Sequence, residues 1–262
     1  MDLSEINKVF TQDAVIKLCA NPPEDQILSE LPYSNRVVRI ANSVVVKFGY
    51  YVKRNEAENQ KRARELVDLT IVYIPKVYGF FQDADNVGYI VMEFVEGSLA
   101  SSMEDDAQID WLVNVVHHIS TLPGTLPGPV GGGPATAVVF GDSNAPEFED
   151  IIDLTDWFNA RLIPDQKPLS CANSDLVLCH LDIAPQNVIW RLNQAPCLID
   201  WASAGFYPRT FERCSQELLG GHLRFRTRFV AALTETMHYS TEETEHMQTV
   251  LAAWSNCQRY SL

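Results

Sequence analysis

The residues with the clearest chemical potential lie between positions 180 and 200, in the segments His-Leu-Asp-Ile-Ala-Pro-Gln-Asn and Leu-Ile-Asp-Trp. They place Asp182, Asn187 and Asp200 close together in the chain. Carboxylate and amide oxygens suit Mg²⁺, which fills its other positions with water and phosphate oxygens. A further carboxylate beside such an ion could orient an acceptor hydroxyl and take its proton. These residue types are therefore those of a phosphoryl-transfer site.

Two short apolar runs predict the element that brings the three residues together. The runs 188–190 and 197–199 are separated by a polar connection that contains Asn193, which is typical of a β-hairpin. Asn187 and Asp200 lie just outside its open end, so strand pairing would bring them within about 5 Å of each other. Asp182, on the preceding loop, is expected to face the same point.

Simpler interpretations of the same residues exist. An H-x-D-x-x-x-x-N pattern arises by chance in a chain of this length about one time in a hundred, and the downstream Asp at hairpin distance makes chance less able to explain it. Taken singly, Asp182 reads as a turn residue, Asn187 as a cap and Asp200 as a strand terminator. A transition-metal site from His180, Asp182 and the His117-His118 pair is disfavoured, because adjacent helical histidines point in different directions. His180 is expected to support the loop structurally.

Lys47 lies in a valine-rich run, where strand alternation places it on the same face as Val45. If that face is buried, the ammonium needs a carboxylate or phosphate partner. A glutamate in the following helix would serve. The alternative is a solvated lysine on an edge strand.

The elements that must position these residues divide into two groups. Valine-rich and turn-bounded runs predict strands at 36–40, 43–48, 76–82 and 87–94, and helices at 4–19 and 54–69, the second with a thin apolar face that packs only lightly. Beyond Gly97 the apolar spacing is helical, with helices expected near 109–119 and at 147–162, 210–219, 223–237 and 242–255. The Gly- and Pro-rich stretch 123–146 is interpreted as a loop that shapes the substrate site.

Composition narrows the class of protein. Acidic residues outnumber basic ones by 34 to 20, for a formal charge of −14, which argues against nucleic-acid and anionic-membrane partners. The six cysteines show neither a C-x-x-C pair nor zinc-ligand spacing, and no window approaches the apolar length of a membrane span. We expect a cytoplasmic protein with reduced thiols.

The two polar segments resemble the H-G-D-x-x-x-x-N and I-D-W motifs of aminoglycoside phosphotransferases and their choline-kinase-like relatives. Val46-Lys47-Phe48-Gly49, the linker at 92–97, the Leu-Pro-Gly-Pro loop and Gly205-Phe206-Tyr207-Pro208 also resemble family members found in fungi. The resemblance implies an α+β, bilobal protein-kinase-like fold, with a small β-rich N-lobe at 1–95 and a larger, mostly α-helical C-lobe at 96–262.

The resemblance also implies roles for individual residues. It makes ATP and Mg²⁺ the cofactors and a hydroxyl, or less readily an amine, of a small molecule the acceptor of the γ-phosphate. The acidic charge favours an amine-bearing acceptor. The implied assignments are Asp182 as catalytic base, Asn187 and Asp200 as Mg²⁺ ligands, Lys47 paired with Glu56 (Glu58 being the second candidate), and the linker backbone at Glu93 and Val95 as the adenine site.

The sequence departs from the family pattern at several positions. No glycine lies between Pro32 and Lys47, so phosphate cover would come from a short turn, either 34–35 or 41–42. Leu181 replaces the motif glycine, and Ala202 stands where many relatives carry Glu. These departures keep two alternatives open: a kinase-fold pseudoenzyme, and a repurposed biosynthetic enzyme that binds a metabolite without phosphoryl transfer.

The motifs do not indicate which residues recognise the substrate. Acidic helix residues could contact an amine, although each taken singly is better explained as part of a solvated face; they are Asp150, Asp153, Asp156, Glu212 and Glu217. A protein-kinase activity is disfavoured by the lack of an A-P-E segment after Asp200. The acceptor, the nucleotide preference and the oligomeric state are not determined by the sequence.

Overall fold

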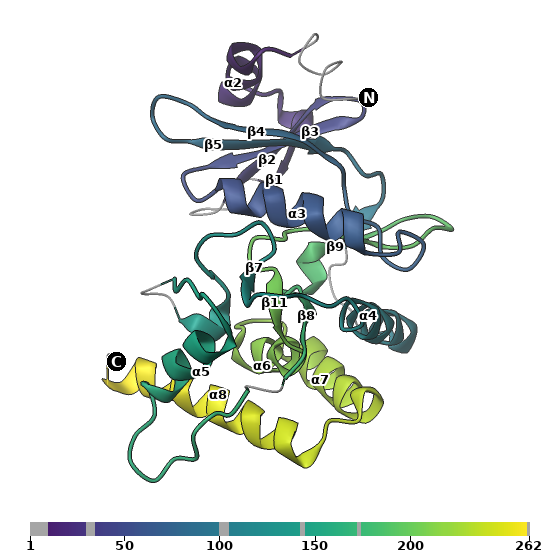
Figure 1. Cartoon of the computed structure of the whole chain (residues 1–262). Coiled ribbons are helices and arrows are strands. Elements are labelled where there is room, and N and C mark those ends of the chain that lie inside the picture. Colours follow the sequence, from purple (N-terminus) through teal and green to yellow (C-terminus); the bar gives the residue numbers. More distant parts are fainter. Residues whose placement is uncertain (1–9, 30–34, 100–104, 142–144, 172–173, 261–262) are drawn as a thin grey trace.

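The computed structural model describes residues 10–29, 35–99, 105–141, 145–171 and 174–260. It has a β-rich N-terminal part stacked on a helical C-terminal part (Figure 1). The α+β class and the two-part arrangement predicted from the sequence are therefore confirmed.

The N-terminal part is built on one antiparallel sheet of five strands in the order β1-β2-β3-β5-β4. The strands are β1 (Ile27–Ser29), β2 (Arg36–Ala41), β3 (Val44–Gly49), β4 (Val77–Gln82) and β5 (Gly88–Glu93). Valine-rich runs form β2 and β3 because branched side chains pack well on a pleated surface. The predicted hairpin is present, with Ala41 opposite Val44. Lys47 lies on β3, the middle strand of the sheet, opposite Ile90 of β5.

Two helices cover the two faces of this sheet. Helix α2 (Gln12–Ala20) begins at Thr11, whose hydroxyl accepts a hydrogen bond from the Ala14 N–H, and buries Val15 and Cys19 against the sheet. The predicted helix at 4–19 is thus present from Gln12 onward, and positions 4–9 lie outside the described residues. Helix α3 (Arg54–Leu66) lies on the face turned toward the helical part (Figure 1).

The prediction that α3 packs only lightly is wrong. The helix buries five residues, and three of them are polar: Glu56, Ala57, Asn59, Gln60 and Ala63. Gln60 illustrates the reason, since its amide donates to the Pro75 carbonyl at 2.8 Å. Hydrogen bonds to specific partners make a polar face as firmly packed as an apolar one.

The C-terminal part consists of helices around two small sheets. Its helices are α4 (Asp106–Ile119), α5 (Ile151–Asn159), α6 (Thr210–Leu218), α7 (Leu223–Met237) and α8 (Thr241–Tyr260). One sheet has the order β10-β9-β6, from Cys197–Leu198, Val188–Trp190 and Ser98–Leu99; the other has the order β7-β11-β8, from Gly128–Pro129, Gly205–Pro208 and Leu176–Cys179. Helix α5 is shorter than predicted because Asp150 caps its start, its carboxylate accepting from the Ile152 and Asp153 N–H groups.

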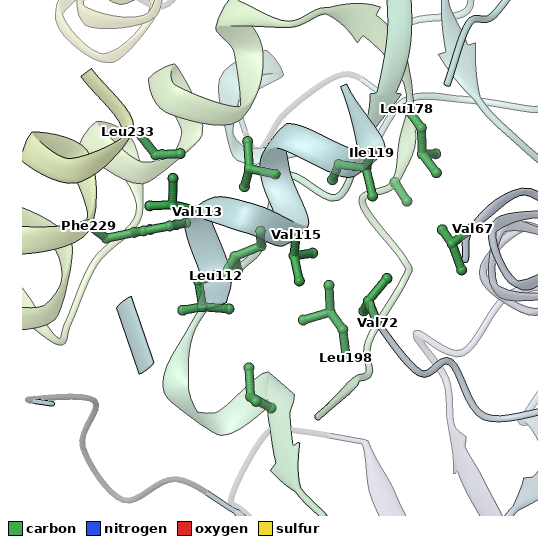
Figure 2. Close-up of a cluster of buried hydrophobic side chains, with 14 of the residues drawn as sticks. Val67, Val72, Leu112, Val113, Val115, Ile119, Leu178, Leu198, Phe229 and Leu233 are labelled. Carbon is green, nitrogen blue, oxygen red and sulfur yellow. The ribbon is translucent and has the colours of Figure 1, made fainter. Parts of the chain in front are cut away.

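The largest hydrophobic cluster joins the two parts. Figure 2 shows α4 side chains such as Leu112 and Val115 between Phe229 and Leu233 of α7 and residues that follow α3. Val67 and Val72 belong to this cluster although they precede the expected boundary at residue 95. Backbone hydrogen bonds continue the connection, since Tyr73 pairs with the β10 strand through Pro196 and Leu198. The segment after α3 therefore packs with the helical part. The lobe boundary predicted at residue 95 stays a proposal.

The Gly- and Pro-rich stretch, interpreted as a loop that shapes the substrate site, is packed against the helices over part of its length. It contributes β7 and a short 3₁₀ helix, Val138–Phe140, with Val139 and Phe140 both buried. The Phe140 ring contacts Phe158 and Tyr207 at centroid distances of 5.8 and 5.4 Å. Aromatic burial of this size holds the stretch against the helices. Positions 142–144 lie outside the described residues.

Candidate active site

The β9–β10 hairpin forms as the sequence predicts. Leu198 lies opposite Val188, and the pairing extends by one step because the Ile199 N–H donates to the Asn187 carbonyl at 2.9 Å. Asn187 and Asp200 therefore flank the open end of the hairpin. Asn187 ends a short 3₁₀ turn, Pro185–Asn187, which bends the chain back toward Asp182.

Asn187 holds Asp182 directly. Its amide nitrogen donates to the Asp182 carbonyl at 2.9 Å and to the Asp182 Oδ2 at 3.0 Å. Because the amide nitrogen is used in this way, the amide oxygen of Asn187 is directed elsewhere and can serve as a ligand. Burial and the nearby Asp200 charge raise the pKa of Asp182 to about 7, against the lowering effect of Asn187 and Arg226.

Lys47 joins the N-terminal sheet to the hairpin. Its ammonium lies 2.6 Å from Glu56 Oε1 and 3.0 Å from Asp200 Oδ1, which brings strand β3, helix α3 and the chain after β10 together. Glu58 instead pairs with Lys61 at 2.8 Å, so the choice between the two glutamates falls on Glu56. Burial lowers the pKa of Lys47, but the Asp200 and Glu56 carboxylates outweigh it and leave the pKa above its ordinary value. Lys47 is therefore charged and not a solvated edge lysine.

The residues at this point fit Mg²⁺. The Asp200 side chain is 35% exposed although Lys47 occupies one of its oxygens, and the attraction of Lys47 overcomes burial to lower its pKa, so it is ionised. An ionised carboxylate and an amide oxygen are hard ligands of the kind Mg²⁺ takes from proteins, with phosphate and water completing the shell. The two candidate ligands are one carboxylate and one amide, since among the described residues no three His, Cys, Asp or Glu side chains gather into a metal-binding group.

His180 supports the loop that carries Asp182 (residues 180–187, the candidate catalytic loop), as expected, and is not a metal ligand candidate with the α4 histidines. Its Nδ1 accepts from the Asp182 N–H at 3.2 Å, so its Nε2 carries the proton and donates to the Ile199 carbonyl at 3.2 Å. Burial lowers the pKa of His180 to about 4, which keeps the ring neutral. His118, by contrast, accepts from the Asp68 N–H on the outer side of α4.

Glu212 on α6 is a functional residue that the sequence interpretation misjudged. It is 1% exposed, so it is not part of a solvated face. Its Oε2 accepts from the His180 N–H at 2.7 Å and from the Leu181 N–H at 3.0 Å. A single buried carboxylate thereby holds the backbone on the N-terminal side of Asp182. Burial raises the pKa of Glu212 to about 7 despite these two hydrogen bonds.

Arg226 on α7 is a second buried charge that the sequence analysis missed. It is 6% exposed, and its guanidinium donates to the Gly220 and Gly221 carbonyls at 2.8 and 2.9 Å and to Gln216 Oε1 at 3.4 Å. The sequence signal was its position three residues before the buried Phe229, on the apolar face of the helix.

The backbone is strained at two positions of the site. Leu181 and Asp200 have φ values of +63° and +64°, in the left-handed region that residues other than glycine rarely adopt. The motif glycine that Leu181 replaces would relieve this strain. Leu181 is nevertheless fully buried in a hydrophobic cluster with Tyr207 and Phe211. Burial of its side chain stabilises the fold, although its backbone is strained.

The linker residues predicted at the adenine site lie at the end of β5. The Glu93 carboxylate accepts from the Tyr73 hydroxyl at 2.7 Å and from the Lys76 N–H at 3.0 Å, so only its backbone carbonyl could contact a base. The Val95 N–H has no hydrogen-bond partner among the residues that the structure describes. The linker therefore has one backbone acceptor at Glu93 and one backbone donor at Val95, two residues apart.

The two turns considered for phosphate cover have different outcomes. The 41–42 turn lies at the linker, because Arg39 donates to the Asn42 carbonyl at 2.6 Å and stacks over Phe94 at 3.9 Å. Asn42 precedes Lys47 by five residues, or roughly 16 Å of extended strand, so this turn does not cover Lys47. The connection between β1 and β2, which includes Ser34, falls mostly outside the described residues.

Comparison with family models places this architecture in a known class. Residues 29–215, which contain Lys47 and every residue of the hairpin site, match the phosphotransferase enzyme family. The chain belongs to this family. Among curated proteins, none matches the sequence.

Solved structures share the fold at low sequence identity. A thermostable mutant of aminoglycoside phosphotransferase APH(4)-Ia has a TM-score of 0.57 at 15% identity, covering 90% of this chain and 85% of its own. A putative fructosamine-3-kinase from Haemophilus somnus has a TM-score of 0.54 at 12% identity, with 90% and 85% covered. The GDP and kanamycin complex of APH(2")-IIIa has a TM-score of 0.50 at 17% identity, with 93% and 89% covered. The protein-kinase-like fold expected from the sequence is thus confirmed.

Leu181→Gly tests whether burial outweighs backbone strain at this position. Relief of left-handed strain should contribute about 1–2 kcal/mol, whereas loss of a fully buried leucine costs about 2–5 kcal/mol. We expect a net loss of roughly 2 kcal/mol in urea unfolding. Asn193→Gly, at an exposed left-handed position (φ +54°) that asparagine tolerates, is the control for introducing glycine without loss of burial and should change stability by less than about 0.5 kcal/mol. A variant more stable than wild type would refute the balance.

Glu212→Gln tests the raised pKa of Glu212. Between its ordinary value of 4.5 and about 7, the folded state binds a proton that the unfolded state has released, so stability falls as pH rises through this window. From pH 5 to pH 8 wild type should lose on the order of 2 kcal/mol relative to the variant, measured by urea unfolding at each pH. The His180 contribution is common to both proteins and cancels. Parallel curves for the two proteins would contradict the shift.

Proposed function

We propose that the protein transfers the γ-phosphate of ATP to a hydroxyl group of a small molecule. The observation that carries this proposal is the convergence of Lys47, Asp182, Asn187 and Asp200 from both parts of the chain, with Lys47 bound to Asp200 at 3.0 Å and Asn187 bound to Asp182 at 3.0 Å. Membership of the phosphotransferase enzyme family supports it. The nucleotide, the metal and the acceptor are parts of the proposal.

Each residue has a role that follows from its contacts. Lys47, oriented by Glu56, would bind a phosphate oxygen of ATP, since its ammonium has three donors and the carboxylates use two. Asn187 and Asp200 would hold Mg²⁺, which neutralises charge on the transferred group when it is bound. The backbone at Glu93 and Val95 would contact the adenine.

Asp182 is the proposed catalytic base. Its carboxylate would orient the acceptor hydroxyl and accept its proton as the oxygen bonds to the γ-phosphorus and the bond to the β-γ bridging oxygen breaks, releasing ADP. A pKa near 7 suits a general base at neutral pH. Glu212 and His180 act through the backbone and are positioning residues.

The acceptor class is supported by charge and by the fold neighbours. The formal charge of −14 favours an amine-bearing acceptor. Two neighbours were crystallised with aminoglycosides, APH(4)-Ia with AMP-PNP and hygromycin B, and APH(2")-IIIa with GDP and kanamycin. We therefore propose a polyhydroxylated, amine-bearing acceptor, and both ATP and GTP belong in its test.

A second candidate function is nucleotide or metabolite binding without transfer. The observation that favours it is the lack of any glycine between Pro32 and Lys47, which removes the flexible phosphate-covering loop of active kinases. This candidate and the leading proposal agree on the ligand and differ in turnover.

Asp200→Ala tests the nucleotide and metal site. Wild type should bind ATP more tightly with Mg²⁺ than with EDTA in titration calorimetry, and the variant should lose this difference, with at least tenfold weaker binding of MgATP. Asp110→Ala, an exposed aspartate on α4, is the matched control and should bind as wild type does. Failure of wild type to bind either form would refute the nucleotide assignment.

Asp182→Asn tests the catalytic base. With ADP release measured across hygromycin B, kanamycin and a fructosamine, turnover on any accepted substrate should fall by a factor of about 10² to 10⁴, while the affinity for MgATP stays within about threefold. Retained turnover would remove Asp182 from the mechanism. Nucleotide binding by wild type without turnover on any hydroxyl-bearing acceptor would favour the second candidate.

A further inference from the structure

The buried face of α3 contains a residue whose role the proposed chemistry does not explain. Glu56, Asn59, Gln60 and Ala63 recur at the spacing of one helical face, and all four are buried. Glu56 contacts Lys47 and Gln60 contacts the Pro75 carbonyl. Asn59 is 0% exposed and contacts neither Lys47 nor the Pro75 carbonyl.

Asn59 connects α3 to the chain that follows Asp200. Its amide nitrogen donates to the Trp201 carbonyl at 3.0 Å and to the Ala202 carbonyl at 3.3 Å. These are the two residues after the proposed metal ligand, and they come from the other part of the chain. Asn59 therefore fixes the backbone beside Asp200 from the helix that carries Glu56, one turn away.

The amide oxygen of Asn59 binds a third segment, the Pro-Gly segment (residues 123–141). It accepts a hydrogen bond from the Gly131 N–H at 2.7 Å. Thr136 of the same segment donates from its hydroxyl to the Ala202 carbonyl at 3.2 Å. The Pro-Gly segment thus contacts both the helix and the chain after Asp200, and Asn59 lies where all three meet.

Gly131 is in close contact with the helix. A Cβ at this position would lie 2.5 Å from the Glu58 Cβ and 3.1 Å from the Asn55 carbonyl oxygen. Both are atoms of the helix that cannot rotate away, so any side chain would push α3 and the Pro-Gly segment apart. The requirement is for close approach alone, because φ of Gly131 is not in the left-handed region.

We infer that Asn59, together with Gly131, is a positioning residue of the nucleotide site. It sets the distance between α3, which carries Glu56, and residues 200–202, so that Lys47 can contact Glu56 and Asp200 together. The Pro-Gly segment is the third component of this junction. The inference deepens the proposed function and rests on its nucleotide site.

The test combines affinity for MgATP with amide hydrogen exchange of the protein without ligand. In Asn59→Ala and Gly131→Ala, MgATP binding in calorimetry should weaken at least tenfold. Exchange should accelerate at the Ala204 N–H, which donates to the Trp201 carbonyl and reports on the chain after Asp200.

Matched controls separate positioning from loss of stability. Asn256 is 4% exposed and donates to two acceptors on a distant part of the fold, the Arg161 carbonyl and Gln166 Oε1. Asn256→Ala should lower the unfolding midpoint as Asn59→Ala does while MgATP affinity stays within about twofold. Gly220→Ala makes the same change as Gly131→Ala where no atom lies within 4 Å, and should be silent in both measurements.

Each outcome decides the inference. Weakened MgATP binding in the Asn59 and Gly131 variants but not in their controls supports it. Equal effects of Asn59→Ala and Asn256→Ala on affinity, or unchanged exchange at Ala204, would overturn it. If wild type does not bind MgATP, the proposed function fails by itself. In that case, faster Ala204 exchange in Asn59→Ala but not Asn256→Ala still supports the junction.

Discussion

The buried ammonium of Lys47 is the constraint on which the site depends. A cation that is 9% exposed needs compensation, and here it receives two carboxylates, Glu56 from α3 and Asp200 from the chain after β10. Glu56 belongs to the β-rich part and Asp200 to the helical part. Pairing both carboxylates with Lys47 therefore fixes the two parts in one geometry. Removing Lys47 would leave the buried Glu56 carboxylate without its cation, which costs more than the ion pair contributes.

A different set of contacts holds the side of the site around Asp182. The candidate catalytic loop has left-handed backbone at Leu181 and is held by Glu212, which accepts hydrogen bonds from two successive N–H groups. Such strain persists only where the surroundings over-determine the conformation. The burial of Leu181 and the hydrogen bonds of Glu212 together fix this conformation of the loop. The Asp182 carboxylate accepts its hydrogen bond from Asn187.

The junction between these two halves explains why polar residues occupy positions that an apolar core would otherwise fill. Asn59 and Gln60 contribute hydrogen bonds whose partners are backbone groups of other segments, and such contacts specify one arrangement where apolar contacts would tolerate several. The apolar cluster that Figure 2 shows supplies cohesion around α4, while the polar contacts of α3 fix its register against residues 200–202.

The sequence by itself determined the hairpin, its flanking Asn187 and Asp200, the lysine on the valine-rich strand, and most helices, because each follows from local periodicity, turn chemistry or motif spacing. It predicted α7 at its observed bounds, and it misjudged the packing of α3 and the burial of Glu212. Both have ordinary local signals, a charged helix and an acidic residue. The structure confirmed Glu56, the first of the two candidate glutamates, as the partner of Lys47. Only the tertiary structure decided that Glu212 holds the candidate catalytic loop and that Gly131 touches α3. The physical reason is that burial of a polar group depends on partners far away in the chain, and periodicity contains no information about them.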